Sequence, residues 1–83
     1  MSKEAKFIIM SKNIEIHEEF IRLDNLLKFA GIAETGGQSK FIIQNGEVLV
    51  NGEVCTMRGK KMRDGDTAQF ENKFVKVVEV SKD

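Results

Sequence analysis

The order of apolar and polar residues first predicts short strands near the N-terminus. Phe7–Met10 is an apolar run, and in Ile14–Ile16 apolar residues alternate with a polar one. Alternation with a period of two is typical of a strand that buries one face. We therefore expect two short strands joined by a turn at Lys12-Asn13.

From Phe20 onward the apolar residues follow a helical period. Four of them fall at positions i, i+3, i+4 and i+7, namely Leu23, Leu26, Leu27 and Ala30. This spacing places them on one face of an amphipathic helix. Glu18 and Glu19 precede the segment, where the helix dipole favours negative charge, and Gly31 stands where many helices end. The pattern predicts a first helix.

A second helix is indicated by its end signals. Thr35 is followed three residues later by Gln38, which is the pattern of a capping box, and Asn45-Gly46 closes the segment. The residues that share its apolar face are Ser39, Ile42 and Ile43. The sequence therefore predicts a helix between Thr35 and Asn45.

After this helix the period becomes two, which predicts a hairpin. Val48 and Val50 point to the same side, and Val54 begins the return strand. Between them, Asn51-Gly52 supplies the two residues that a type I′ turn requires, because both positions need positive φ. The segment is expected to form two antiparallel strands.

A second hairpin is expected near the C-terminus. Asp64–Asp66 marks a turn, and Thr67–Phe70 and Phe74–Val80 are predicted strands joined near Glu71–Lys73. The resulting order predicts an α+β fold in which two helices pack on a small antiparallel sheet, with a short N-terminal strand extension. A length of 83 residues allows a single domain, residues 1–83.

Composition narrows the class of protein. The chain is 41% hydrophobic and 31% charged, which is typical of a soluble globular domain. No apolar run approaches the roughly 20 residues that span a bilayer, so no membrane contact is expected. The only cysteine, Cys55, cannot form an internal disulfide, which favours the cytoplasm.

The net charge is zero, but the charge is unevenly distributed. Residues 22–63 hold seven Lys and Arg against four Asp and Glu, whereas the flanking segments are acidic. The densest basic stretch surrounds Gly59 and contains Arg58, Lys60, Lys61 and Arg63. A local patch attracts phosphate more effectively than the total charge does. On charge alone, phosphate binding and a solvated basic turn are equally good interpretations.

The order of these residues resembles the alpha-L RNA-binding motif, the domain named after ribosomal protein S-four. The matching elements cover about residues 21–70 and are Arg22-Leu23-Asp24, Leu27, Gly31, residues 35–40, Ile43, Gly46, Val48, Val50-Asn51-Gly52 and Gly65-Asp66. No single element is distinctive, but their order and spacing together are much more specific. The overall size is similar to that of the free-standing bacterial members.

The resemblance implies that two helices and the hairpin loop grip structured RNA, ribosomal or transfer RNA, largely through backbone phosphates. Arg22 and Lys40 match basic positions of the motif. The motif often has Ser-Arg at the start of its second helix, where this chain has Thr35-Gly36. The missing arginine removes one expected phosphate contact.

Gly36 and Gly37 lie in the first turn of the second helix. Because a glycine inside a helix costs about 1 kcal/mol relative to alanine, two in succession need a reason. Phosphate could approach the free N–H groups of Gly36, Gly37 and Gln38, as it does at many helix N-termini. Alternatively, the glycines ease a tight turn into the helix. We favour phosphate binding.

Phe41 lies on the face of the second helix that is expected to be polar. It is about 200° from Ser39 around the helix axis and nearly opposite the centre of the face that Ser39, Ile42 and Ile43 share. It either packs under the N-terminal strands or presents a ring on which a base could stack. Of the two, packing is the favoured interpretation.

Beside an RNA-binding motif, the basic stretch is better interpreted as a phosphate-binding loop than as a solvated turn. The residues expected to lie on one loop and to contact phosphates are Arg58, Lys60, Lys61 and Arg63. Each phosphate neutralised makes the binding more sensitive to salt. Met62 is expected to anchor the loop in the core.

Motifs for catalysis are incomplete. His17 has no second histidine at zinc-protease spacing, and Cys55 has no CxxC partner. Lys61 stands where a nucleotide-binding loop needs Ser or Thr, and the upstream Gly52 is wrongly spaced. We therefore expect no enzyme, no metal, no cofactor and no small-molecule substrate, and interpret His17 and Cys55 as structural.

Two functional hypotheses remain. The leading one is a monomeric, non-catalytic binder of structured RNA that acts in ribosome assembly or RNA metabolism. The rival is a protein-interaction adaptor that keeps the fold but binds RNA weakly, which the neutral charge and the missing arginine favour. A continuous positive face that joins Arg22, Lys40 and residues 58–63 would support RNA binding, whereas scattered charge would support the adaptor.

Overall fold

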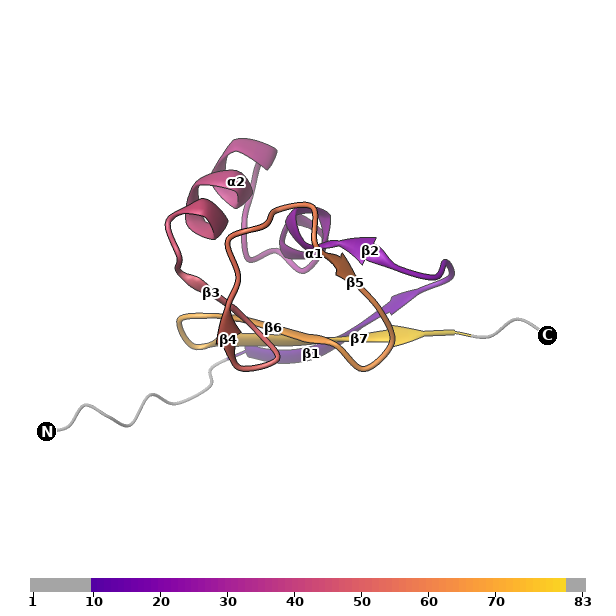
Figure 1. Cartoon of the computed structure of the whole chain (residues 1–83). Coiled ribbons are helices and arrows are strands. Elements are labelled where there is room, and N and C mark those ends of the chain that lie inside the picture. Colours follow the sequence, from indigo (N-terminus) through magenta and orange to yellow (C-terminus); the bar gives the residue numbers. More distant parts are fainter. Residues whose placement is uncertain (1–9, 81–83) are drawn as a thin grey trace, which may run out of the picture.

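The computed structural model describes residues 10–80, which form two helices and seven strands. Their bounds are β1 Met10–Ile16, β2 Ile21–Arg22, α1 Leu23–Phe29, α2 Gly36–Gln44, β3 Val48–Val50, β4 Glu53–Val54, β5 Lys61–Met62, β6 Thr67–Phe70 and β7 Lys73–Glu79. Five strands form one sheet in the order β1-β7-β6-β3-β4, and β2 pairs with β5 in a separate ribbon. Both helices and the ribbon lie on the same face of the sheet (Figure 1). The predicted α+β class is confirmed.

The N-terminal strand differs from its prediction. Met10–Ile16 is one continuous strand, so the turn expected at Lys12-Asn13 is wrong. Most of the other expected strand, Phe7–Met10, lies outside the described residues. β1 pairs in parallel with β7, from Met10 opposite Lys73 to Ile16 opposite Glu79, and the sheet is therefore mixed. Residues 11–13 are exposed, so backbone pairing rather than side-chain burial holds this part of the edge strand in place.

The first helix begins later than the apolar period suggested. Ile21 and Arg22 belong to β2, and α1 starts at Leu23. The first N–H groups of a helix lack partners within the helix. Here Leu23 N donates to the carbonyl of Lys60 at 2.8 Å, and Asp24 N donates to that of Arg58 at 3.1 Å. The segment before β5 thus supplies the acceptors for the first N–H groups of α1.

The second helix begins and ends where its signals predicted. The Thr35 hydroxyl accepts a hydrogen bond from Gln38 N at 3.0 Å. The Gln38 side chain accepts from Glu34 N at 2.8 Å, one residue earlier than in the usual capping box. Ser39 is fully buried and donates to the carbonyl of Asp24 at 3.1 Å, so this bond joins α2 to the start of α1.

Both predicted hairpins are confirmed. Asn51 has φ 52° and Gly52 has φ 88°, the positive values of a type I′ turn between β3 and β4. The Asn51 side chain also accepts from Thr67 N at 3.0 Å, which fastens the turn to β6. β6 and β7 form the second hairpin.

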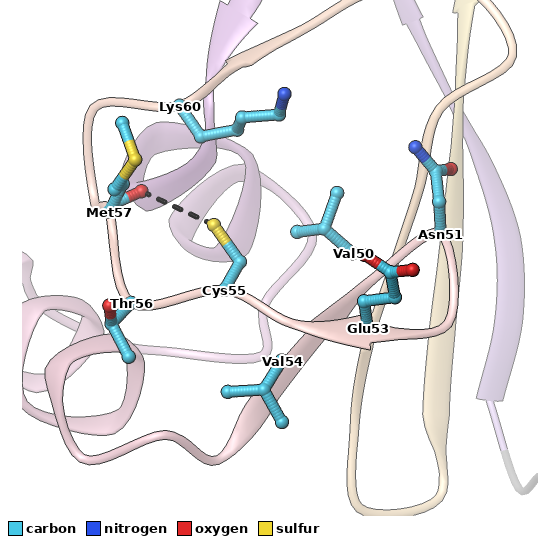
Figure 2. Close-up of a pocket in the computed structure, with 8 residues that line it drawn as sticks. All are labelled: Val50, Asn51, Glu53, Val54, Cys55, Thr56, Met57 and Lys60. Atoms are coloured by element: carbon cyan, nitrogen blue, oxygen red, sulfur yellow. Dashed lines mark hydrogen bonds between the residues drawn. The ribbon is translucent and has the colours of Figure 1, made fainter.

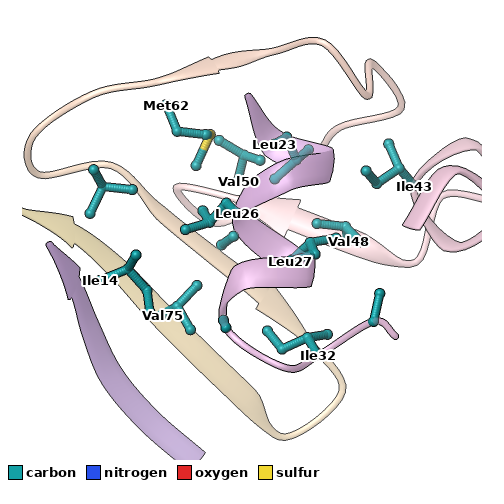
Figure 3. Packing of buried hydrophobic residues seen from close by; sticks show 14 of the residues in the cluster. Ile14, Leu23, Leu26, Leu27, Ile32, Ile43, Val48, Val50, Met62 and Val75 are labelled. Atoms are coloured by element: carbon teal, nitrogen blue, oxygen red, sulfur yellow. The ribbon is translucent and has the colours of Figure 1, made fainter. Parts of the chain in front are cut away.

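The core lies between α1 and the sheet (Figure 3). Leu23, Leu26 and Leu27 of α1 are fully buried, and the sheet contributes Val48 and Val75 to the same cluster. Met62 is fully buried as well, which confirms its predicted role as an anchor. Because Met62 points inward, its neighbours on β5 are directed outward, toward the surface of the ribbon.

Candidate nucleic-acid interface

The β2–β5 ribbon gathers side chains from two distant segments on its outer surface. Arg22 lies opposite Lys61, and Ile21 lies opposite the buried Met62. Residues two apart on a strand point to the same side. Hence Arg22 of β2 with the preceding Phe20, and Lys61 of β5 with the following Arg63, share the outer side, which we call the ribbon face.

Phe20 lies on the ribbon face beside two of its three cations. The Lys61 Nζ atom is 5.0 Å from the centroid of its ring, and the Arg63 Cζ atom is 5.6 Å from it. At such distances a cation is attracted to an aromatic ring. Phe20 is not among the predicted site residues, because the apolar period placed it at the start of a helix. Had the segment been interpreted as extended, the two-residue spacing of Phe20 and Arg22 would have placed them on the same side.

Arg22 is held in place at the edge of the ribbon face. Its Nη2 atom is 3.1 Å from a carboxylate oxygen of Asp24. The same nitrogen would lie 3.7 Å from a Cβ atom placed on Gly59, so the guanidinium group rests against the loop at this glycine. Asp24 neutralises part of its charge. Within residues 10–80, no carboxylate lies at ion-pair distance from Lys61 or Arg63, so neither charge on the ribbon face is neutralised in this part of the chain.

The predicted basic loop is divided between two surfaces. Lys61 and Arg63 lie on the ribbon face, whereas Lys60 is half-buried and lines a separate groove (Figure 2). The other residues that line this groove are Val50, Asn51, Glu53, Val54, Cys55, Thr56 and Met57. Arg58 is exposed on the loop between the two surfaces. Lys60 therefore shares its surroundings with an acidic residue, Glu53, and not with Lys61.

The start of α2 is open to solvent. A Cβ atom on Gly36 would meet nothing within 4 Å, and one on Gly37 would meet only the Thr35 hydroxyl at 3.9 Å. Neither glycine has positive φ, so the backbone does not require glycine at these positions. The N–H of Gln38 already donates to Thr35. Of the three backbone amides predicted to bind phosphate, those of Gly36 and Gly37 therefore remain as candidates.

Lys40 and Phe41 are both exposed on α2. Phe41 has 65% of its surface exposed, so the favoured interpretation, packing under the N-terminal strands, is wrong. Lys40 follows Ser39, the residue that bonds to Asp24. Asp24 thus holds Arg22 through its carboxylate and α2 through its carbonyl, and it links the helix that carries Lys40 to the ribbon.

Among residues 10–80, no three His, Cys, Asp or Glu side chains come together to hold a metal ion. In the same part of the chain, no helix combines the length and the apolar character needed to cross a membrane. The Cys55 thiol lies 3.8 Å from the carbonyl of Met57, inside the groove of Figure 2.

Comparison with known proteins identifies the family. The sequence profile of the S4 domain matches residues 14–78. The chain belongs to the S4 domain family. A relative of this S4 domain is the probable ribosome maturation protein RlbA of Bacillus subtilis (strain 168), 39% identical over 62 residues, which are 75% of this chain and 87% of RlbA. Another is the putative RNA-binding protein YbcJ of Escherichia coli (strain K12), 40% identical over 58 residues, 70% of this chain and 83% of YbcJ.

A solved structure agrees with this assignment. The solution structure of E. coli YbcJ, described as revealing an alpha-L motif involved in RNA binding, superposes with a TM-score of 0.58 at 31% identity. The match covers 94% of this chain and 95% of YbcJ. The resemblance predicted from the sequence is confirmed. Both relatives are named for RNA binding or ribosome maturation rather than for a reaction, which supports the prediction of a non-catalytic domain.

Proposed function

We propose that this S4 domain binds structured RNA without catalysing a reaction, and that its target is ribosomal RNA. The observation that carries the proposal is the convergence of Arg22, Lys61 and Arg63 on the ribbon face from two distant segments. Cations gathered on one rigid surface suit the regularly spaced phosphates of a nucleic acid. The names of the relatives support RNA as the ligand.

The contacts are mainly to the RNA backbone. Lysine and arginine bind phosphates regardless of base, so the protein recognises the shape of a folded RNA. Lys40 and the amides of Gly36 and Gly37 add phosphate contacts from α2, and Arg58 adds one from the loop. Phe41 offers an exposed ring to an unpaired base. Lys60 contributes least, because it lines the groove that also contains Glu53.

A ribosomal target rests on the relative named for ribosome maturation. We propose that the protein acts as a monomer on ribosomal RNA during assembly of the ribosome, in the cytoplasm. A small domain that gathers three cations on its ribbon face is suited to hold a folded segment of RNA while other components join it. No cofactor, metal or small-molecule substrate takes part in this binding.

A protein-interaction adaptor is the second candidate. It is favoured by three exposed apolar side chains, Phe29 at 71%, Met57 at 64% and Val54 at 61%. Met57 and Val54 line the groove of Figure 2 and form an apolar surface separate from the ribbon face. In an adaptor this groove, and not the ribbon face, would carry the function.

Crosslinking in living cells tests the proposal. The tagged protein is irradiated in cells, purified under denaturing conditions, and its bound RNA is sequenced. We expect enrichment of defined ribosomal RNA segments over total RNA. The matched control is the Lys61→Ala, Arg63→Ala double variant at equal expression, which should lose most of that enrichment. Crosslinked RNA at background level for the wild type, together with a protein partner that is lost on changing Val54 and Met57, would establish the adaptor instead.

A further inference from the structure

Phe20 lies just outside the segment that resembles the RNA-binding motif, yet its ring lies beside two cations of the ribbon face. Its ring is partly buried. Within residues 10–80, the partly buried apolar side chains that pack against the core are Met10, Ile21, Cys55 and Phe70, and Phe20 is not one of them. Its ring instead contacts the head groups of Lys61 and Arg63. The ring therefore interacts with cations at the surface and not with the hydrophobic core.

The backbone spacing of Lys61 and Arg63 is suited to neighbouring phosphates of a single RNA strand. Lys61 and Arg63 are two residues apart along an extended backbone, which separates their Cα atoms by about 6.6 Å. This is comparable to the distance between successive phosphates along one strand. Both head groups are near the same ring, 5.0 Å and 5.6 Å from its centroid, so they are held as a pair.

The physical advantage of the ring is preorganisation. Free lysine and arginine side chains adopt many rotamers, and fixing each on a phosphate costs conformational entropy. A cation that already rests against an aromatic ring has lost part of this freedom before the RNA arrives. Since neither Lys61 nor Arg63 has an acidic partner within residues 10–80, the ring orients them without neutralising them. Asp24, in contrast, orients Arg22 and also reduces its charge.

We propose that Phe20 is a positioning residue that holds Lys61 and Arg63 so that the pair binds two successive phosphates of one RNA strand. The proposal rests on the proposed function and specifies which charges act together. The positioning is indirect: the ring touches the two cations, and the cations touch the RNA.

The test uses Phe20→Leu, which removes the ring and keeps an apolar side chain, and Phe20→Tyr, which keeps the ring. The probe is a fluorescently labelled mixed-sequence RNA hairpin, and the measurement is the dissociation constant over a series of salt concentrations. We expect Phe20→Leu to bind about threefold to tenfold more weakly, and Phe20→Tyr to bind like the wild type. The slope of log affinity against log salt should not change in either variant, because the charges remain.

A second background separates positioning from direct stacking. In the Lys61→Ala, Arg63→Ala double variant, Phe20→Leu should cause no further loss of affinity, because the cations that the ring positions are absent. A full further loss in this background would show that the ring stacks on a base, and would overturn the proposal. Thermal melts of each variant without RNA identify any loss that arises from unfolding alone.

The binding experiment also separates failure of the positioning role from failure of RNA binding itself. If the wild type binds the hairpin and Phe20→Leu binds equally well, the positioning role is wrong while RNA binding stands. If the wild type does not bind the hairpin, the proposed function fails and takes the positioning role with it. Side-chain proton shifts of Lys61 supply an independent check, since the ring current of Phe20 should displace them in the wild type and not in Phe20→Leu.

Discussion

The helical layer, formed by α1, α2 and the β2–β5 ribbon, and the five-stranded sheet both place a cation beside an aromatic ring. In the ribbon, Lys61 and Arg63 share the ring of Phe20. In the sheet, Lys73 Nζ is 5.8 Å from the ring of Phe70. The local contact is thus the same in kind in both layers, and it does not by itself make a binding site.

The two layers differ in what surrounds this contact. Lys73 follows the exposed Glu71 at a hairpin turn, in a C-terminal segment, residues 64–83, that holds five acidic residues against three basic ones. The ribbon instead receives Arg22 from β2 and two cations from β5 and the residue after it. Convergence of like charges from separate segments is what distinguishes the ribbon face. We therefore propose that the helical layer binds RNA, whereas most of the strand pairing lies in the sheet.

The largest expected effect falls on the sheet and tests whether the two roles can be separated. Gly52→Val forces a β-branched residue into a position with φ 88°. We expect it to lower the free energy of unfolding by about 1–3 kcal/mol, measured by urea denaturation. RNA affinity, measured at low temperature where the variant is folded, should stay at the wild-type value. A parallel loss of affinity would show either that the layers are coupled or that the hairpin loop itself contacts RNA, as the resemblance implies.

The second effect falls on the ribbon. Lys61→Ala with Arg63→Ala should weaken binding to the RNA hairpin about twentyfold near physiological salt, and should flatten the salt slope by about 1.5–2 units. The control is Lys73→Ala with Lys76→Ala, which removes the same charge from the sheet. It should change affinity and slope far less, through the long-range field alone. Circular dichroism checks the fold of both variants, because Met62 lies between the ribbon cations.

A third pair of substitutions distinguishes Lys60 from the other cations of the basic stretch. Because Lys60 lines the groove with Glu53, Lys60→Ala with Lys61→Ala should flatten the slope by only about one unit. Equal effects from all three pairs would mean diffuse attraction with no defined site, and would remove the distinction between the layers.

A smaller effect is expected at the start of α2, where the motif often has arginine. Gly36→Arg places a side chain in open space at a position without positive φ, so the domain should remain as stable as the wild type. We expect a severalfold gain in RNA affinity and a slope steeper by about 0.7–0.9. Gln44→Arg is the matched control, since it adds the same charge to an exposed site at the other end of α2. An equal gain from both variants would exclude a specific contact at Gly36.

The smallest expected effect is none at all. Addition of a chelator should leave the melting temperature of the wild type unchanged, and light scattering should give the mass of a monomer. A large loss of stability in chelator would reveal a metal that holds one of the layers together. The layers would then not be stabilised by the apolar core alone.

Much of the fold could be predicted from local signals. Thr35 and Gln38 set the start of α2, Asn51-Gly52 set the type I′ turn, and Met62 is buried as expected. Capping and turn geometry depend on residues within a few positions of one another, so a single sequence contains the required information. The basic residues of the site could also be identified from the sequence, because the charge of a side chain is known from its residue type.

The grouping of those residues was decided by the tertiary structure. β1 pairs with β7 and β2 pairs with β5 through backbone hydrogen bonds, which leave no signature in the side chains. The first N–H groups of α1 are satisfied by carbonyls of Lys60 and Arg58, a contact that no local pattern encodes. Only this pairing brings Phe20 and Arg22 beside Lys61 and Arg63, and turns Lys60 away. The sequence alone determined which elements and charges the protein has, because these depend on neighbours in the chain. Which charges act together depended on strand pairing across some forty residues, as between Arg22 and Lys61, and the burial of the shared core selects that pairing.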